Sequence, residues 1–398
     1  MRSIIVLIGY NRPESLERLL QSVLAADFPE DDEIDLTVSL DHSNKENEII
    51  ECLKKYDWPH GEKKIRTQEK RMGLRSHVIS CGELIADHDF LIMLEDDLVV
   101  APGFYNYTRS AYAKYEAYEN VIGISLYAPH TVLQNGRHFE PEYNGSDTYL
   151  CQMAQSWGQA WSKRMWTGFH EWYMNNQTFA QPLDMPDNAW GWDERSWLRY
   201  FMGYASSGEN YLVYPYHSYS TNMNEVGENF AEKNSDCQTA LSLKKQNFVM
   251  YDREQCVKYN AHLERKQDAY FDYSYNGEKV LMDLNGTYTK YGDYRYVVST
   301  NRLDYRIIDS YGLNRRPQER NLIEKIPGNT IWLYDLSVKE KNTQKKNFVQ
   351  VIRYDVKAIS WTRLTYLGLK EGLQETIIRN RKLYKKIHKR QRAKENTK

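Results

Sequence analysis

The stretch Phe90-Leu91-Ile92-Met93-Leu94-Glu95-Asp96-Asp97-Leu98 joins an apolar run to three successive carboxylates. Five apolar residues in a row predict a fully buried strand, and the acidic residues follow at its carboxyl end. Adjacent carboxylates repel one another unless a cation or another ligand satisfies them. Because ligands of open α/β sheets bind at the carboxyl ends of strands, the placement predicts a divalent metal beside a phosphorylated substrate.

The first hundred residues alternate between strand and helix patterns. The expected strands cover residues 3–9, 34–40, 64–68 and 90–95. The expected helices lie between them, from a cap at Asn11, over 45–56 and over 74–86. Such alternation predicts an α/β fold with a mostly parallel, Rossmann-like sheet flanked by helices. The strand ends at Gly9, Asp41, Gln68 and Asp97 would then lie along one edge.

A chain of 398 residues is long enough for about two domains. We expect a catalytic domain over 1–235, with a nucleotide half at about 1–100 and an acceptor half at about 101–235. Charge and polarity rise after it, which predicts a helical linker over 236–269. A small β-rich C-terminal domain over 270–355 follows, since turn residues there separate strand-like stretches. The last part, 356–398, has the pattern of an amphipathic basic tail helix.

The charge of the chain is unevenly spread. From Trp361 onward twelve Lys and Arg face three acidic residues, a charge of +9, and the remainder carries −10 because the whole chain carries −1. A basic tail on an acidic body suggests a surface anchor and argues against a nucleic-acid partner. An anionic membrane surface is the partner that we expect for the tail, and a disordered solubilising end or a helix on a partner subunit is the alternative.

Cysteine and aromatic contents give further expectations. The five cysteines are scattered, with no CxxC spacing, and no apolar run is long enough to cross a bilayer. We therefore expect a cytoplasmic protein, peripheral at the inner face of the plasma membrane through its tail. The 32 tyrosines and 10 tryptophans suggest a carbohydrate or nucleic-acid ligand, although core packing explains most of them.

The decapeptide from Glu95 to Phe104, EDDLVVAPGF, resembles the acidic motif EDDLxVAPxFF of the N-acetylglucosaminyltransferase I family. That resemblance implies a GT-A glycosyltransferase fold, a Mn²⁺ cofactor, UDP-N-acetylglucosamine as donor and inversion at the anomeric carbon.

Shorter matches extend the resemblance over about the first 230 residues. Gly9-Tyr10-Asn11-Arg12 falls where the family has a segment near the nucleotide, and Val38-Ser39-Leu40-Asp41 is similar to its VSxD, whose Asp recognises uracil. Arg75-Ser76-His77 is similar to an Arg-His pair in the nucleotide site, and Trp192-Asp193-Glu194 to a Trp-Asp-Asp segment that carries the proposed base. The membrane anchor and stem of the family are not found here, and nothing after about residue 270 matches. The mannose-bearing acceptor of the family is therefore not carried over, and a bacterial enzyme of surface polysaccharide synthesis fits the chain better.

For the donor site, Asp97 is the first candidate to coordinate Mn²⁺ (or Mg²⁺), with Glu95 and Asp96 orienting ribose, waters or sugar. Solvated carboxylates at a strand end are the alternative. Asp41 is a candidate uracil ligand, or else an ordinary turn residue. The other candidates for nucleotide-sugar binding are Gly9, Asn11, Arg12, Arg75 and His77, of which the arginines could be surface residues and His77 structural.

For catalysis, Asp193 is the candidate base, because the tryptophans on either side could exclude water and raise its pKa. An N-cap role for a helix over 194–202 is the alternative, and Glu194 and Asp187 are substitute bases. Trp157, Trp190, Trp192 and Glu194 are candidates for acceptor binding, with core packing equally expected for each tryptophan. His217, before a polar loop with Asn224, Glu225 and Gly227, is a second candidate metal ligand or an ordinary loop histidine.

Together these features predict a metal-dependent inverting transfer of a hexose from a UDP-sugar to a hydroxyl of a glycan or lipid-linked glycan. One alternative is a sugar-1-phosphate nucleotidyltransferase, which would normally show a Gly-rich Arg-Lys signature after the first strand. Gly9-Tyr10-Asn11-Arg12-Pro13 lacks that signature. The other alternative is a non-catalytic glycan-binding protein with the same fold.

Overall fold

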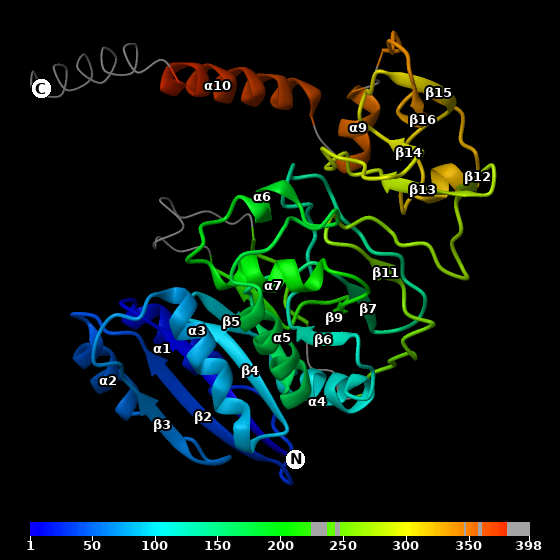
Figure 1. Cartoon of the computed structure of the whole chain (residues 1–398). Helices are drawn as coiled ribbons and strands as arrows, with labels where there is room; N and C mark the ends of the chain where they lie inside the picture. The colour runs from blue at the N-terminus through cyan, green and yellow to red at the C-terminus, as the bar shows by residue number, and fades with distance from the viewer. Residues whose placement is uncertain (224–236, 243–246, 346–347, 357–359, 380–398) are drawn as a thin grey trace, which may run out of the picture. The chain divides into compact units, whose positions relative to one another are not determined.

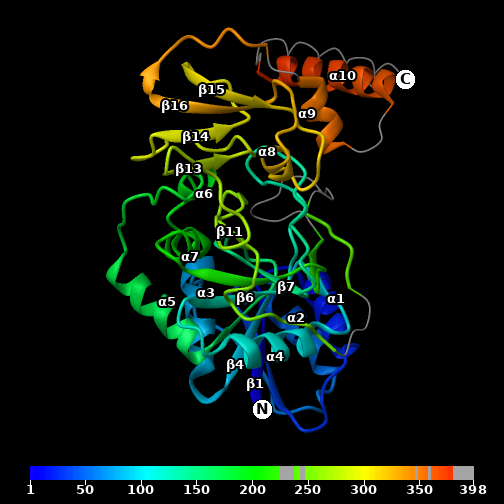
Figure 2. The same cartoon turned by 90° about the vertical axis from the view of Figure 1, so that its right-hand side faces the viewer.

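The computed structural model describes residues 1–223, 237–242, 247–345, 348–356 and 360–379. Contacts divide the chain into two units, Met1–Lys346 and Asn347–Lys398. The first unit holds two large sheets and a two-stranded ribbon, and the candidate site belongs to the largest sheet (Figures 1 and 2).

The larger sheet has nine strands in the order β11-β7-β9-β6-β8-β4-β1-β2-β3. Its N-terminal half consists of β1 (Arg2–Gly9), β2 (Glu33–Leu40), β3 (Lys63–Arg66) and β4 (Phe90–Glu95), all parallel. Seven of the eight residues of both β1 and β2 are buried, as expected for strands covered on both faces. This half confirms the predicted α/β fold with a mostly parallel sheet.

The other half of this sheet mixes parallel and antiparallel pairs. It consists of β6 (Val121–Ser125), β7 (Thr148–Cys151), β8 (Gln159–Ser162), β9 (Tyr211–Pro215) and β11 (Lys258–Tyr259). Strand β8 runs antiparallel to both β4 and β6, while β9 is parallel to β6. Residues 129–151 suggest a loop from sequence alone, but they end in β7, whose four residues are all buried and lack the polar alternation of a surface strand.

Helices follow the strands of the first half. They are α1 (Pro13–Leu24), α2 (Glu46–Lys54), α3 (Leu74–Gly82) with a 3₁₀ turn at Glu83–Asp87, and α4 (Phe104–Tyr115). Helix α1 buries Leu16, Leu19, Leu20 and Val23, the stripe that its spacing predicts. The expected cap at Asn11 is wrong: Arg12 is the N-cap residue, without a side-chain cap, and Pro13 opens the helix because proline needs no hydrogen bond there.

The acceptor half adds α5 (Lys163–Asn175), α6 (Asp187–Trp190) and α7 (Trp197–Ala205). A two-stranded ribbon pairs β5 (Leu98–Val100) with β10 (Ser220–Asn222). Strand β5 of this ribbon begins directly after the acidic residues that follow β4.

The second sheet of this unit has the order β12-β13-β14-β16-β15. Its strands are β12 (Ser274–Tyr275), β13 (Glu278–Asp283), β14 (Tyr296–Ser299), β15 (Tyr305–Tyr311) and β16 (Ile331–Lys339), with the short helix α8 (Arg320–Ile323). Its own core contains Leu281, Val297, Trp332 and Tyr334. The predicted β-rich region is thus present, but the expected helical linker is not: residues 237–242 and 247–269 form turns, bridges and β11 without a helix. Polar residues of this segment pair with the first domain instead. Asp252, for example, forms an ion pair with Lys114 of α4.

The second unit contains α9 (Phe348–Asp355) and α10 (Trp361–Arg379). Tyr366, Leu369 and Leu373 of the predicted apolar stripe are exposed. Other residues of the expected stripe, Tyr384 and Ile387, and Lys382 of the expected basic face lie outside the described residues. In the described ranges, the helices are all too short or too polar to cross a bilayer.

Candidate functional site

The candidate site lies at the carboxyl ends of β1, β2 and β4. The strand register places Gly9 beside Leu40, and Ile8 beside Glu95. A Cβ atom at Gly9 would lie 2.7 Å from a methyl of Leu16 and 3.0 Å from one of Leu40, which explains the glycine where β1 turns toward α1. The backbone N–H of Asp41 donates to the Gly9 carbonyl at 3.0 Å, so the ends of β1 and β2 stay together. The sheet thus brings residues from three separate motifs to one edge, as predicted.

The three carboxylates after β4 have different environments. Asp96 accepts from Nε of Arg12 at 3.2 Å and from a terminal guanidinium nitrogen of the same residue. The same guanidinium lies 3.5 Å from Oδ2 of Asp97. Burial raises the pKa of Glu95 above its ordinary value, and the charges of Asp97 and Asp96 raise it further. The charge of Arg12 and a hydrogen bond from Trp197 lower this pKa, but by less. The guanidinium of Arg12 therefore neutralises only part of the negative charge of these three carboxylates.

Asp97 is the residue of this cluster that fits a metal. It is 8% exposed, and its Oδ1 atom is buried without a hydrogen-bond partner. A buried carboxylate oxygen without a partner is costly, and such an oxygen is the hard ligand that Mn²⁺ and Mg²⁺ prefer. Among the described residues, no three His, Cys, Asp or Glu side chains gather to hold a metal.

The structure does not bring His217 to this cluster. Ser220 pairs with Val100 and Asn222 with Leu98, so β10 approaches the acids with its C-terminal end. The N–H of Met223 donates to the carbonyl of Asp97 at 2.8 Å. His217 is exposed at the opposite end, where its charge lowers the pKa of His130 after the larger effects of burial and His138. The loop residues Asn224, Glu225 and Gly227 lie outside the described residues.

Asp41 holds the loop that leads into α3. Its Oδ1 atom accepts from the backbone N–H of His42 at 2.9 Å and of Met72 at 2.7 Å, and its Oδ2 atom accepts from Gly73 at 2.9 Å. Asp41 is 4% exposed, so these bonds replace water around a buried charge. Gly73 is the N-cap residue of α3, with a φ of 79° that favours glycine.

His77 and Arg75 of α3 have different roles. His77 is buried, its Nε2 lies 2.8 Å from Oγ of Ser39, and burial lowers its pKa, so its contacts in this structure are structural. Arg75 donates to the Glu194 carbonyl at 2.8 Å and to the Tyr200 hydroxyl at 2.9 Å. Arg75 thereby connects the nucleotide half to the loop between α6 and α7. Asn11 is exposed.

Asp193 lies in the loop between α6 and α7, with 56% of its side chain exposed. The side chain of Arg195 lowers the pKa of Asp193 to about 2, helped by the Arg195 backbone N–H. The expected raised pKa is therefore wrong, because the carboxylate is exposed and pairs with Arg195. The N-cap alternative is also wrong, since α7 begins at Trp197 with Ser196 as its N-cap residue.

The three candidate tryptophans of the acceptor half are half-buried. The Arg199 guanidinium lies over the Trp190 ring at 4.5 Å, and Trp157 meets the edge of Tyr127 at 4.6 Å. Trp192 packs beside the core. Sequence reasoning missed two neighbours of the acids, Trp197 and Met223. Their positions depend on β10 and on where α7 begins, and Ser-Thr-Asn is too short and polar to predict a strand.

Residues 4–160 match the family model described as Glycosyl transferase family 2. No curated protein matches the sequence. The structure of this chain has low similarity to the crystal structure of S. aureus TarS 1-349, with a TM-score of 0.37. The two sequences are 15% identical, and the alignment covers 55% of this chain and 60% of that chain. Mannosyltransferase PcManGT from Pyrobaculum calidifontis, in complex with GDP-Man and Mn²⁺, gives 12% identity over 45% of this chain and 47% of that chain, with a TM-score of 0.30.

Both alignments thus span less than two thirds of the compared chains. The family match confirms the predicted enzyme class, a glycosyltransferase, and leaves the resemblance to N-acetylglucosaminyltransferase I a prediction. Residues 4–160, which match the glycosyltransferase family model, therefore include the parallel strands β2, β3 and β4, most of β1, and the acidic residues that follow β4.

Proposed function

We propose that this protein transfers a sugar from a UDP-sugar donor to a hydroxyl of a glycan acceptor, with inversion and with the help of a divalent metal. The observation that carries the proposal is the unpartnered, buried Oδ1 of Asp97 at the strand edge that also holds Arg12 and Asp41. The resemblance of the acidic decapeptide to N-acetylglucosaminyltransferase I favours N-acetylglucosamine or a related hexose as the transferred sugar.

Asp41 is the proposed uracil ligand. An ionised carboxylate has about four lone-pair directions, and three are used by the backbone N–H groups of His42, Met72 and Gly73. Only one of these bonds is made to Oδ2, which leaves this oxygen able to accept the uracil imide N–H. The fixed loop would give the base a preformed surface.

Asp97 is the proposed metal ligand, and Mn²⁺ or Mg²⁺ bound there would neutralise charge on the departing diphosphate. Arg12 holds Asp96 and lies near Asp97, so it orients both carboxylates. Gly9 and Asn11 form the turn that brings Arg12 to them. Glu95 and Asp96 would orient ribose, water or sugar. His217 is not retained in this set, because β10 holds it away from Asp97.

Asp193 remains the proposed base, because its carboxylate is ionised at neutral pH and its loop is held to α3 by the Arg75 bond to Glu194. A carboxylate paired with Arg195 is a weak base. We therefore propose that the acceptor hydroxyl displaces Arg195 from Asp193, with Trp190 and Trp192 beside the acceptor. Trp157 and Glu194 complete the proposed acceptor site.

The proposed setting is bacterial surface polysaccharide synthesis, on a lipid-linked acceptor at the inner face of the membrane. The charge of +9 from Trp361 onward supports attraction to an anionic membrane surface.

The variant Asp193→Asn tests the base. We expect it to bind UDP with Mn²⁺ as the unmodified protein does, measured by calorimetry, and to lose transfer by about 10²-fold or more. The matched control Asp31→Asn should keep full activity, since Asp31 is an exposed aspartate outside the proposed donor and acceptor sites. Full activity in Asp193→Asn would show that another group is the base. UDP binding without donor hydrolysis for any UDP-sugar would favour the non-catalytic alternative.

A further inference from the structure

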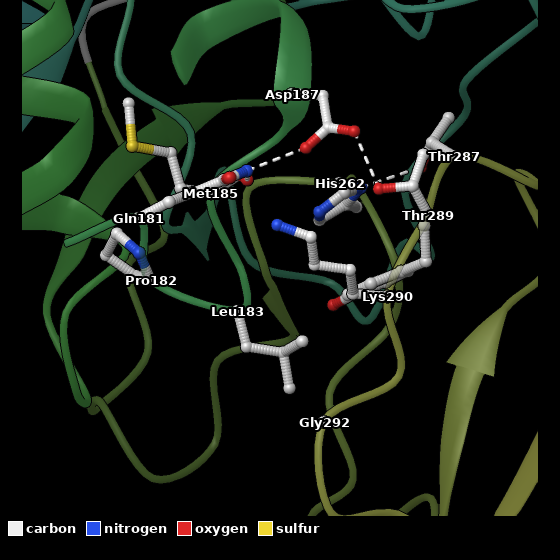
Figure 3. A pocket seen from close by; sticks show the side chains of 11 residues that line it. Gln181, Pro182, Leu183, Met185, Asp187, His262, Thr287, Thr289, Lys290 and Gly292 are labelled. Carbon is white, nitrogen blue, oxygen red and sulfur yellow. Dashed lines mark hydrogen bonds between the residues drawn. The ribbon is translucent and has the colours of Figure 1, made fainter.

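A cavity of about 200 Å³ lies between the segment before α6 and the segment that follows β13. Gln181, Leu183 and Asp187 line it from the first sheet's side, and Thr289 and Lys290 from the second (Figure 3). His262 also lines the cavity, and its ring is drawn between Asp187 and Lys290 in this view. The cavity is thus lined by segments that connect elements of both large sheets, and it needs both sets of segments.

The polar side chains of this cavity are held in place. Asp187 accepts from Nε2 of Gln181 at 2.7 Å and from Oγ1 of Thr289 at 2.6 Å. The His262 ring stacks on Tyr288 with 3.8 Å between centroids, and its Nδ1 lies 2.8 Å from Oγ1 of Thr287. These contacts fix the direction of the carboxylate and of the imidazole before any ligand arrives.

One buried atom in the cavity has no partner. His262 is 2% exposed, and its Nε2 makes no hydrogen bond, although the Leu183 backbone lies close to the ring. A buried ring nitrogen without a partner costs free energy that a ligand hydroxyl would recover. Asp187 and Lys290 are both exposed.

The charges of the cavity favour an uncharged ligand. The carboxylate of Asp187 and the ammonium of Lys290 have opposite signs, and their attraction helps to lower the pKa of Asp187, after the larger effects of Thr289 and Gln181. Burial lowers the pKa of His262 to about 4, so the imidazole is neutral at pH 7. The lining therefore offers both hydrogen-bond donors and acceptors, and the charges of Asp187 and Lys290 cancel. A polyhydroxyl compound satisfies such a set, whereas a phosphate or carboxylate would meet Asp187.

We propose that this cavity binds one neutral sugar ring of the acceptor glycan, at a distance from the hydroxyl that is glycosylated. The inference rests on the proposed function, because α6 leads from Asp187 to Trp190 and then to the loop that carries Asp193 and Glu194. The volume is below the roughly 300–1,000 Å³ of sites for drug-sized ligands, so a single ring fits better than an oligosaccharide.

The test uses the full chain and neutral monosaccharides as probes: N-acetylglucosamine, glucose, galactose and mannose at millimolar concentration, followed by ligand-detected NMR. Leu183→Trp places a large ring in the cavity from a side chain that is 38% exposed, so folding is preserved. Leu183→Met is the matched control. We expect at least one sugar to bind, and Leu183→Trp to weaken it by about tenfold or more, the effect of roughly 1.4 kcal/mol, while Leu183→Met does not.

His262→Phe is a second variant that retains stacking on Tyr288 and removes Nε2, and it should weaken the same sugar. UDP binding with Mn²⁺, measured on the same samples, should be unchanged in all three variants. The inference is overturned if no neutral sugar binds, if Leu183→Trp binds it as well as Leu183→Met, or if glucose 6-phosphate or glucuronate binds more tightly than glucose. Failure of the proposed function appears separately, as loss of UDP binding in the unmodified protein.

Discussion

At the scale of single residues, the carboxylates after β4 are distinguished by their partners. Asp96 is held by Arg12, while Oδ1 of Asp97 has no partner, although the two residues are adjacent. The sequence could predict that Asp41 and Asp97 lie on the same edge of the sheet, because both follow parallel strands. It could not predict that Arg12 pairs with Asp96 or that Arg195 pairs with Asp193, since such contacts depend on side-chain directions that no spacing specifies.

Arg195→Ala tests whether Asp193 takes up the proton. Arg195 lowers the pKa of Asp193 to about 2, from an ordinary value of 3.8. A base is active when unprotonated, so activity falls as the pH drops through its pKa. Removing Arg195 raises that pKa, and the acid limb of the kcat/KM profile should move to higher pH by up to about two units. Brief pH-jump assays measure it, and Arg195→Lys should restore the original profile. An acid limb that stays in place in Arg195→Ala would exclude Asp193 as the titrating base.

At the scale of elements, periodicity predicted the strands and helices of the first hundred residues within a few positions. α1 and β4 are examples, because their apolar residues recur at the spacing of one buried face or form a continuous run. The short strands β7 and β10 were missed, since their pairing partners are distant in sequence. The expected linker helix failed for a related reason: its polar residues pair with α4 and β7, which local propensity does not report.

Gly82→Ala tests the packing of α3 against α5. A Cβ atom there would lie 1.9 Å from the Trp166 ring, which is 4% exposed and packs edge-on against Trp161. Because that ring cannot move freely, we expect a loss of about 1–3 kcal/mol in the free energy of unfolding by urea. Gly191→Ala is the matched control, since its nearest atom would be 3.3 Å away at an ordinary φ of −74°, and it should change stability less. Equal stability of Gly82→Ala and the unmodified protein would contradict this packing.

At the scale of the whole molecule, the charge is divided between an acidic body and a basic end. Residues from Trp361 onward carry +9, while the rest carries −10. The distribution of charged residues along the sequence shows this division. The basic residues beyond 379 lie outside the described residues, and membrane binding by them is tested by experiment.

We expect the full chain to sediment with vesicles containing phosphatidylglycerol and far less with phosphatidylcholine vesicles. Each basic residue near an anionic surface contributes about 1 kcal/mol, and salt weakens that attraction. The triple variant Lys382→Glu, Lys385→Glu and Lys386→Glu should reduce binding, while Lys54→Glu in α2 serves as a control for charge alone. Equal binding to both vesicle types would exclude the electrostatic anchor.

The central claim is that the acidic edge of the sheet holds a metal and a nucleotide diphosphate together through Asp97. Calorimetric titration of UDP in the presence and absence of Mn²⁺ tests it most directly, with Asp97→Asn beside Asp31→Asn, an exposed aspartate, as control. The account predicts that Mn²⁺ strengthens UDP binding at least about tenfold in the unmodified protein and in Asp31→Asn but not in Asp97→Asn. UDP affinity that is the same with and without Mn²⁺, or that survives unchanged in Asp97→Asn, would contradict it.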